Sequence, residues 1–255
     1  MIDIHCHLTF PGLNEIKDKV IAEAKKSMNA IITCGLSRDC EKALEVSKKY
    51  PEFVYLSLGI HPEDIINMND EGIEKNLEFI RSHADDIVSV GEVGLDRYWV
   101  KDDEQNEKCK GIFIRCLDIA KELNLPVVLH SRDAEEDVFK LICENNIKQA
   151  VFHHYSGSIT LAKQIIESGY YISIPTIIKT SKNLKKIGKS FPLYKLMTET
   201  DSPFNSPTQN KANYPYNVKL TLDKIYELRN TSFETVDKAT TENAIKFFGL
   251  KLEHV

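Results

Sequence analysis

Eight short runs of apolar and β-branched residues recur along the chain, and they constrain its fold more than any other feature. They occupy residues 2–4, 30–34, 53–58, 87–90, 127–129, 150–152, 170–174 and 196–200. Each run is short enough to be a buried strand. Between them lie stretches such as 112–123, 134–144 and 160–168, whose apolar residues have the three- and four-residue spacing of a helix. Strands that alternate with helices indicate parallel pairing through right-handed crossovers.

Eight such units predict a closed (β/α)8 barrel, the TIM barrel, with its active site at the C-terminal ends of the strands. The 255 residues suit one barrel, so we expect a single domain over residues 1–255. The alternative is a doubly wound open sheet, but that fold predicts a glycine-rich phosphate loop, and the chain contains neither G-x-G-x-x-G nor a P-loop. Residues 203–217 contain three prolines and predict a long loop, and residues 218–248 predict two helices.

Composition narrows the function classes. No run approaches the roughly 18 apolar residues of a membrane span, and the first residues lack a basic segment followed by an apolar one, so we expect a cytoplasmic protein with no membrane partner. The six cysteines show no C-x-x-C spacing and are predicted to be reduced. The net charge of −5 argues against sequence-independent coating of nucleic acid. It does not exclude a nuclease, because bound divalent ions supply local positive charge. We expect a monomer.

The first two residues of the predicted site along the chain are histidines. His5 and His7 flank Cys6 at the end of the first strand, and because side chains alternate along a strand, both imidazoles can face the barrel mouth. Two imidazoles on one strand suit a divalent cation. Taken alone, however, H-x-H is more often a pair of ordinary half-buried histidines.

Glu92 ends the fourth predicted strand within V-G-E-V-G-L-D. Burial of a lone carboxylate is costly, and a metal offsets that cost. A carboxylate can also bridge two ions. The alternative is a glutamate that caps the next helix or pairs with Arg97.

His130 follows the fifth strand, and the tandem pair His153 and His154 follows the sixth. Adjacent strand residues face opposite sides, so only one of the pair should bind metal. Asp201 follows the eighth strand, with Glu199 on the same face and one layer deeper. The alternative role of Asp201 is a helix N-cap or an Asx turn before Ser202 and Pro203. Histidines and acids at the ends of strands one, four, five, six and eight predict one metal site at the barrel mouth.

The sequence resembles the TatD family of metal-dependent deoxyribonucleases, which are barrels of the amidohydrolase type. The resemblance rests on D-I-H-C-H-L, G-I-H-P, G-E-V-G-L-D, L-P-V-V-L-H-S-R-D-A, F-H-H-Y-S-G and E-T-D-S-P, which begin at residues 3, 59, 91, 125, 152 and 199. Together these motifs span nearly the whole chain.

The resemblance implies two divalent metal ions (Mg, Mn or Zn) and a DNA substrate. One ion would be held by His5, His7, Glu92 and Asp201, and the other by Glu92, His130 and His153. It also implies that His61 contacts the phosphate. Asp201 and Glu92 would be catalytic together with His61, Asp201 also accepting the proton of the attacking water. Arg132 and a protonated His61 are predicted to stabilise charge on the phosphate.

The chain departs from the family pattern at two places. The segment after Pro203 lacks the basic stretch of many relatives, and Cys109 replaces a glutamine that commonly precedes the helix of the fifth unit. Both departures concern substrate contacts. Lys179, Lys182, Lys185, Lys186 and Lys189 form an acid-free run that could follow a DNA backbone, although a solvated helix face is the favoured interpretation.

Two other functions remain open from sequence. The same metal pair could hydrolyse a small amide, lactone or phosphoester, or the barrel could be a non-catalytic binding protein. The presence of Glu92, where some such barrels carry a modified lysine, favours the nuclease. A binding protein would be expected to have lost a ligand, and none is missing.

Overall fold

The computed structural model describes residues 1–208 and 212–252. Eight strands form one sheet in sequence order, and every neighbouring pair is parallel. The strands are β1 (Ile2–Cys6), β2 (Ala30–Gly35), β3 (Val54–Leu58), β4 (Ser89–Gly94), β5 (Val127–His130), β6 (Ala150–Phe152), β7 (Tyr171–Ile174) and β8 (Leu196–Thr198). The predicted TIM barrel is confirmed.

The barrel closes just beyond the ends of β1 and β8. Cys6 and Ser202 form an isolated parallel bridge. The N–H of Asp201 donates to the carbonyl of His5 at 3.0 Å, and the N–H of His7 donates to the carbonyl of Ser202 at 2.7 Å. The segments that carry three of the predicted metal ligands therefore form the seam of the barrel.

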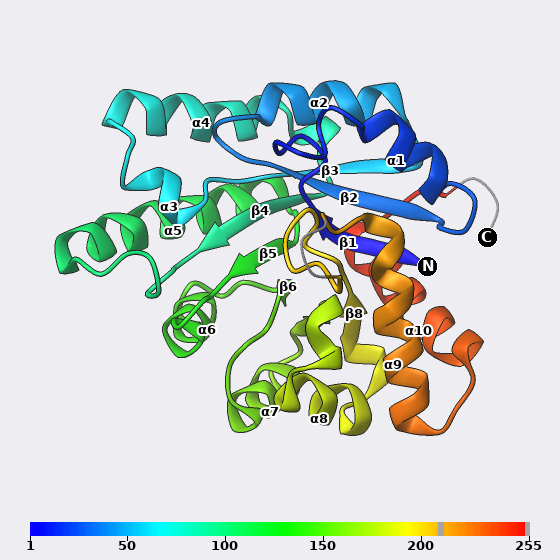
Figure 1. Ribbon diagram of the computed structural model, residues 1–255. Helices are drawn as coiled ribbons and strands as arrows, with labels where there is room; N and C mark the ends of the chain where they lie inside the picture. The colour runs from blue at the N-terminus through cyan, green and yellow to red at the C-terminus, as the bar shows by residue number, and fades with distance from the viewer. Residues whose placement is uncertain (209–211, 253–255) are drawn as a thin grey trace.

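Ten helices in the described residues follow the strands and surround them (Figure 1). They are α1 (Lys17–Ala24), α2 (Cys40–Lys49), α3 (Pro62–Ile65), α4 (Asp70–Ser82), α5 (Asp103–Leu123), α6 (Glu135–Glu144), α7 (Ile159–Glu167), α8 (Lys182–Ser190), α9 (Val218–Arg229) and α10 (Phe233–Phe248). Short polar residues begin many of them, and the side chains of Asn69, Asp102, Ser158, Ser181 and Ser232 each accept a first-turn N–H.

Apolar packing forms two layers. The larger cluster lies between the strands and the helices. The smaller one joins side chains from several strands, including Ile4, Ile32, Val128 and Met197, to residues of α10 such as Phe247. Because these residues come from strands all around the sheet, they fill the barrel interior, and α10 covers one end of it. The polar mouth lies at the other end.

The structure corrects two strand limits. The fourth strand was predicted over 87–90, but β4 runs over Ser89–Gly94, so Glu92 lies inside it. Two glycines and an acid hide this extension from the apolar pattern. The eighth strand was predicted over 196–200, but β8 ends at Thr198, because the N–H of Thr200 donates to the side chain of Asp3. The loop after β8 is confirmed over its described part, as are the two final helices; residues 209–211 lie outside the described chain.

No helix among the described residues combines the length and apolar character needed to cross a membrane.

Candidate metal centre

The six predicted ligands meet in one cluster at the barrel mouth. They come from β1, β4, β5, the end of β6 and the turn after β8. Ligand atoms of His5, His153 and Asp201 lie within 4.8 Å of one another, as do those of His61, Glu92 and His130. The site is therefore built from residues far apart in sequence, on a rigid barrel frame.

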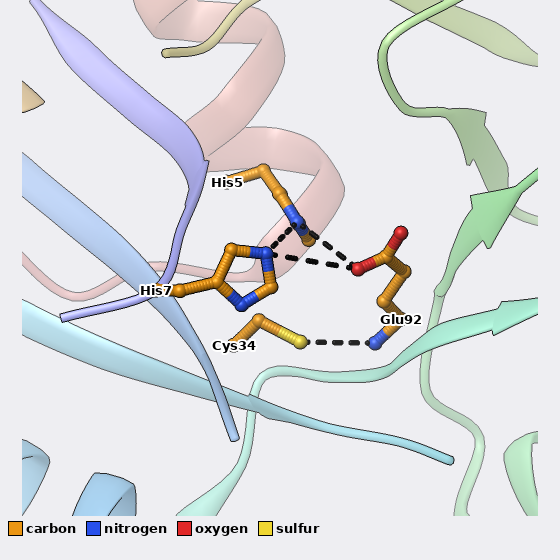
Figure 2. Close-up of side chains that lie close together, drawn as sticks. All are labelled: His5, His7, Cys34 and Glu92. Carbon is orange, nitrogen blue, oxygen red and sulfur yellow. Dashed lines mark hydrogen bonds and ion pairs between the residues drawn. The ribbon is translucent and has the colours of Figure 1, made fainter. Parts of the chain in front are cut away.

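One half of the cluster surrounds a single oxygen of Glu92. His5 Nε2 lies 3.4 Å from Glu92 Oε2, and His7 Nε2 lies 3.2 Å from His5 Nε2 and 3.5 Å from Asp201 Oδ1. Figure 2 shows both imidazoles directed at the Glu92 carboxylate. Tetrahedral ligands about 2.1 Å from an ion are about 3.4 Å apart, so these distances fit a divalent cation.

The other half surrounds the second oxygen of the same carboxylate. Glu92 Oε1 lies 2.5 Å from His130 Nδ1 and 2.8 Å from His153 Nε2. The two oxygens of Glu92 thus face two different sets of nitrogen and oxygen donors. This is the arrangement of a carboxylate able to bridge two ions.

Irregular strand pairing directs these side chains into the mouth. The β1–β2 ladder shifts register between Asp3 and Cys6, around His5, and the β4–β5 ladder shifts between Val90 and Val93, around Glu92. Bulges of this kind re-aim side chains near active sites. Sequence alternation does not reveal them.

Cys34 supports Glu92 from the backbone side. Its Sγ accepts the N–H of Glu92 at 3.2 Å (Figure 2). The same sulfur donates to the carbonyl of Gly91 at 3.4 Å. Burial, together with the charge of Glu92, raises the pKa of the Cys34 thiol well above its usual value. Cys34 therefore acts as a neutral support that the sequence analysis missed, because no metal-binding cysteine spacing marks it.

Two further carboxylates hold the histidines from behind. Asp96 Oδ2 lies 2.8 Å from His130 Nε2, and Glu199 Oε1 lies 3.4 Å from His153 Nδ1. Such partners set the orientation and tautomer of a ligand histidine. Sequence alternation placed Glu199 in the layer below Asp201, whereas it gave no role to Asp96, whose only signal is its position in G-E-V-G-L-D.

Asp201 sits in a tight turn with a left-handed backbone, at φ 56°. Its Oδ2 accepts from Asn205 Nδ2 at 2.8 Å, which leaves Oδ1 facing the histidines. Burial alone would raise the pKa of Asp201, but the hydrogen bond with His7 and the charges of nearby histidines lower it below the usual range. Asn205 belongs to the segment that departs from the family pattern, so this segment supports the site.

Charges inside the cluster are strongly coupled. Burial alone would raise the pKa of Glu92, yet the charges of His153, His61 and His130 lower it well below its usual value. Burial alone would lower the pKa of His130, but Glu92 and Asp96 raise it to about 9. In the metal-free protein, a carboxylate at the centre is therefore balanced by protonated imidazole.

His61 lies beside this cluster as the N-cap of α3. Its Nδ1 accepts the N–H of Glu63 at 3.2 Å, and its Nε2 lies 3.3 Å from His130 Nδ1. Burial and the charge of His130 lower the pKa of His61 to about 3. In the metal-free protein this lowered pKa favours neutral His61, with Nε2 facing the cluster, and the protonated His61 expected from the sequence stays a prediction.

The remaining predicted residues lie outside the cluster. The backbone N–H of His154 donates to Glu199 Oε1, and it is the neighbouring His153 whose imidazole pairs with Glu92. The Arg132 side chain is exposed and stacks over Tyr98, with 3.8 Å between Cζ and the ring centroid. The structure shows Arg132 at the mouth but not in contact with the ligands.

A TIM barrel with clustered histidines and carboxylates at its mouth defines the class of metal-dependent hydrolases. Within this class, residues 2–249 match the family model described as TatD related DNase. The chain belongs to the TatD family, as its motifs predicted.

Relatives and solved structures agree with this assignment. An uncharacterized metal-dependent hydrolase of Methanocaldococcus jannaschii is 38% identical, over 98% of each chain. The deoxyribonuclease TATDN3 of Homo sapiens is 33% identical, over 100% of this chain and 96% of the relative. The crystal structure of YJJV, a TatD homologue from Escherichia coli, superimposes with a TM-score of 0.89 at 26% identity, over 98% of each chain. The protein is a metal-dependent hydrolase of this family.

Proposed function

We propose that this hydrolase is a deoxyribonuclease that cleaves DNA phosphodiester bonds at a centre of two divalent ions, Mg, Mn or Zn. The observation that carries the proposal is the division of the Glu92 carboxylate, whose Oε2 faces His5 and His7 while Oε1 faces His130 and His153. The naming of the human relative as a deoxyribonuclease supports DNA as the substrate.

The donor set fits the ions that the proposal requires. Imidazole and carboxylate donors suit zinc and manganese, and carboxylate also suits magnesium. His5, His7, Asp201 and Glu92 would hold one ion, and Glu92, His130 and His153 the other. When bound, such a pair would activate water for in-line attack and neutralise charge on the phosphate.

Two of the protein's own residues would act on the substrate: Asp201 as the proton acceptor and His61 as a hydrogen-bond donor to the phosphate. Asp201 Oδ2 is held by Asn205, and Oδ1, which faces the histidines, would accept the proton of the attacking water. The capping bond to Glu63 keeps the proton of His61 on Nε2, which points toward the cluster. This fixed donor can bind a phosphate oxygen without carrying a charge.

Cleavage of end-labelled single-stranded and duplex DNA tests the proposal. The assay compares the wild type with Glu92→Ala and Asp201→Ala in magnesium, manganese or zinc. We expect metal-dependent cleavage that both variants lose, and the product ladder will show whether cutting begins at an end. If metal-loaded protein leaves all DNA and RNA intact but cleaves small phosphoesters, lactones or amides, the nuclease proposal is wrong.

A further inference from the structure

Exposed aromatic side chains gather around the metal centre. Four large hydrophobic side chains are exposed in the described chain: Tyr98 (42%), Trp99 (55%), Phe204 (41%) and Tyr194 (67%). The first three lie in the loops that follow β4 and β8, at the barrel mouth. Tyr194 precedes β8 and therefore belongs to the opposite end of the barrel. Large apolar surface left open beside a polar site indicates a contact made with a ligand.

The Tyr98–Trp99 turn is anchored to one half of the metal cluster. Asp96 Oδ1 accepts the N–H groups of Tyr98 and Trp99 at 2.8 and 2.7 Å. The other oxygen of Asp96 lies 2.8 Å from His130 Nε2. One buried carboxylate thus fixes both a proposed ligand and the backbone of the aromatic pair.

Phe204 lies against the other half. Its ring centroid is 5.7 Å from that of His7 and 4.8 Å from that of Phe10. The Phe204 side chain therefore packs against Phe10 while remaining partly open to solvent. Each half of the cluster is thus in contact with a loop that carries an exposed aromatic side chain, through the backbone of Trp99 on one side and the ring of Phe204 on the other.

Positive charge accompanies the Tyr98–Trp99 pair. The Arg132 guanidinium lies 3.8 Å from the Tyr98 ring centroid and 5.7 Å from that of Trp99. None of the ion pairs in the described part of the chain involves Arg132. Aromatic rings beside an unpaired arginine are the elements with which proteins bind a nucleic-acid strand.

We propose that Trp99 and Phe204 are specificity-determining residues that stack on nucleobases flanking the scissile phosphate, one on each side of the metal centre. This inference rests on the proposed nuclease function. Arg132 lies where it can contact the phosphate next to the base on Trp99. A base within a duplex is already stacked, so each contact requires an unpaired nucleotide.

The single tryptophan of the chain allows a direct test, because Trp99 is the only source of indole fluorescence. Magnesium-loaded protein is titrated with an oligothymidylate that has phosphorothioate linkages, which slows its cleavage. A matched oligomer carries abasic tetrahydrofuran units and the same number of charges. We expect saturable quenching of Trp99 by the thymidylate and none by the abasic oligomer.

Variants measure the contribution of each ring. Anisotropy of the labelled oligomers should show that Trp99→Ala and Phe204→Ala each weaken thymidylate binding by about 5- to 150-fold, the range for one base stacked on an aromatic ring. Neither variant should alter the affinity for the abasic oligomer. Tyr194→Ala, which removes the exposed aromatic ring at the far end of the barrel, is the matched control and should change neither affinity.

The outcomes separate this inference from the proposed function. If DNA binds and is cleaved, but both mouth variants weaken the two oligomers equally or not at all, the stacking role is refuted and the nuclease function stands. If no oligomer binds and no DNA is cleaved, both proposals are refuted.

Discussion

Replacement of Asp96 by asparagine would test the histidine support in isolation. Asparagine keeps an oxygen for the N–H groups of Tyr98 and Trp99, so the turn should remain folded. Its NH2 group would instead face His130 Nε2, where the carboxylate oxygen now lies at 2.8 Å. That geometry requires Nε2 to accept, which moves the imidazole proton to Nδ1, the atom that faces Glu92. The variant would thus present the wrong tautomer to an ion.

The magnitude follows from the role of the Asp96 carboxylate as the hydrogen-bond partner of a ligand histidine. Partners of this type contribute about 10- to 100-fold to metal affinity, or about 1.4–2.7 kcal/mol. Calorimetric titration of metal-stripped protein with manganese should show one of two binding steps weakened by this factor. The other step, assigned to His5, His7 and Asp201, should change little.

A matched control lies in the same loop. Asp102 also accepts a backbone N–H, that of Gln105, but it is exposed and caps α5. Asp102→Asn should leave both binding steps unchanged. Wild-type affinity at both steps in folded Asp96→Asn, or equal weakening of the two, would refute the reasoning.

Four other predictions concern the cluster and the segments around it. Gly94→Ala should lower the free energy of unfolding, measured in denaturant titrations, by at least about 1–3 kcal/mol. The reason is that φ is +152° and a Cβ would lie 1.9 Å from the carbonyl oxygen of His130. Gly111→Ala is the control: a Cβ there meets nothing within 4 Å, so the free energy of unfolding should rise by about 0.5–1 kcal/mol. Metal binding at pH 7 should release protons, because the pKa of His130 is raised to about 9 without metal. Calorimetry in buffers of different ionisation enthalpy should detect this release, and a binding heat that does not depend on the buffer would contradict it. The raised pKa also stabilises the metal-free fold fully below pH about 6.5, and this contribution is lost as pH rises through about 9. Asn205→Ala should lower kcat by about tenfold by freeing the Asp201 carboxylate, equivalent to about 1.4 kcal/mol, and unchanged kcat would argue against that role.

The apolar runs were sufficient to predict the barrel, because each buried strand is a short continuous apolar segment and each crossover helix has its own period. Where polar or glycine residues continue a strand, the apolar pattern did not predict where the strand ends, as in β4, which continues through Glu92 to Gly94. Strand ends also pointed to six residues that converge in space, since parallel strands share one edge.

The supports of the cluster were not predictable in the same way. Asp96, Cys34 and Asn205 act through contacts between segments distant in sequence, and their residue types are common in loops and cores. The pairing of Trp99 with Asp96 likewise depends on the turn geometry after β4. Side-chain periodicity carries no information about such contacts.

The seam between β1 and the segment after β8 has a consequence for folding. His5 and Asp201 are joined there by a backbone hydrogen bond, so this ligand set is complete only when the segment after the last strand docks on the first strand. Contacts between such distant segments form late, because closing a long loop is entropically costly. An ion held by His5, His7 and Asp201 would cross-link the two ends of the sheet and should slow unfolding more than it speeds folding. In that case chelation would shorten the lifetime of the folded barrel.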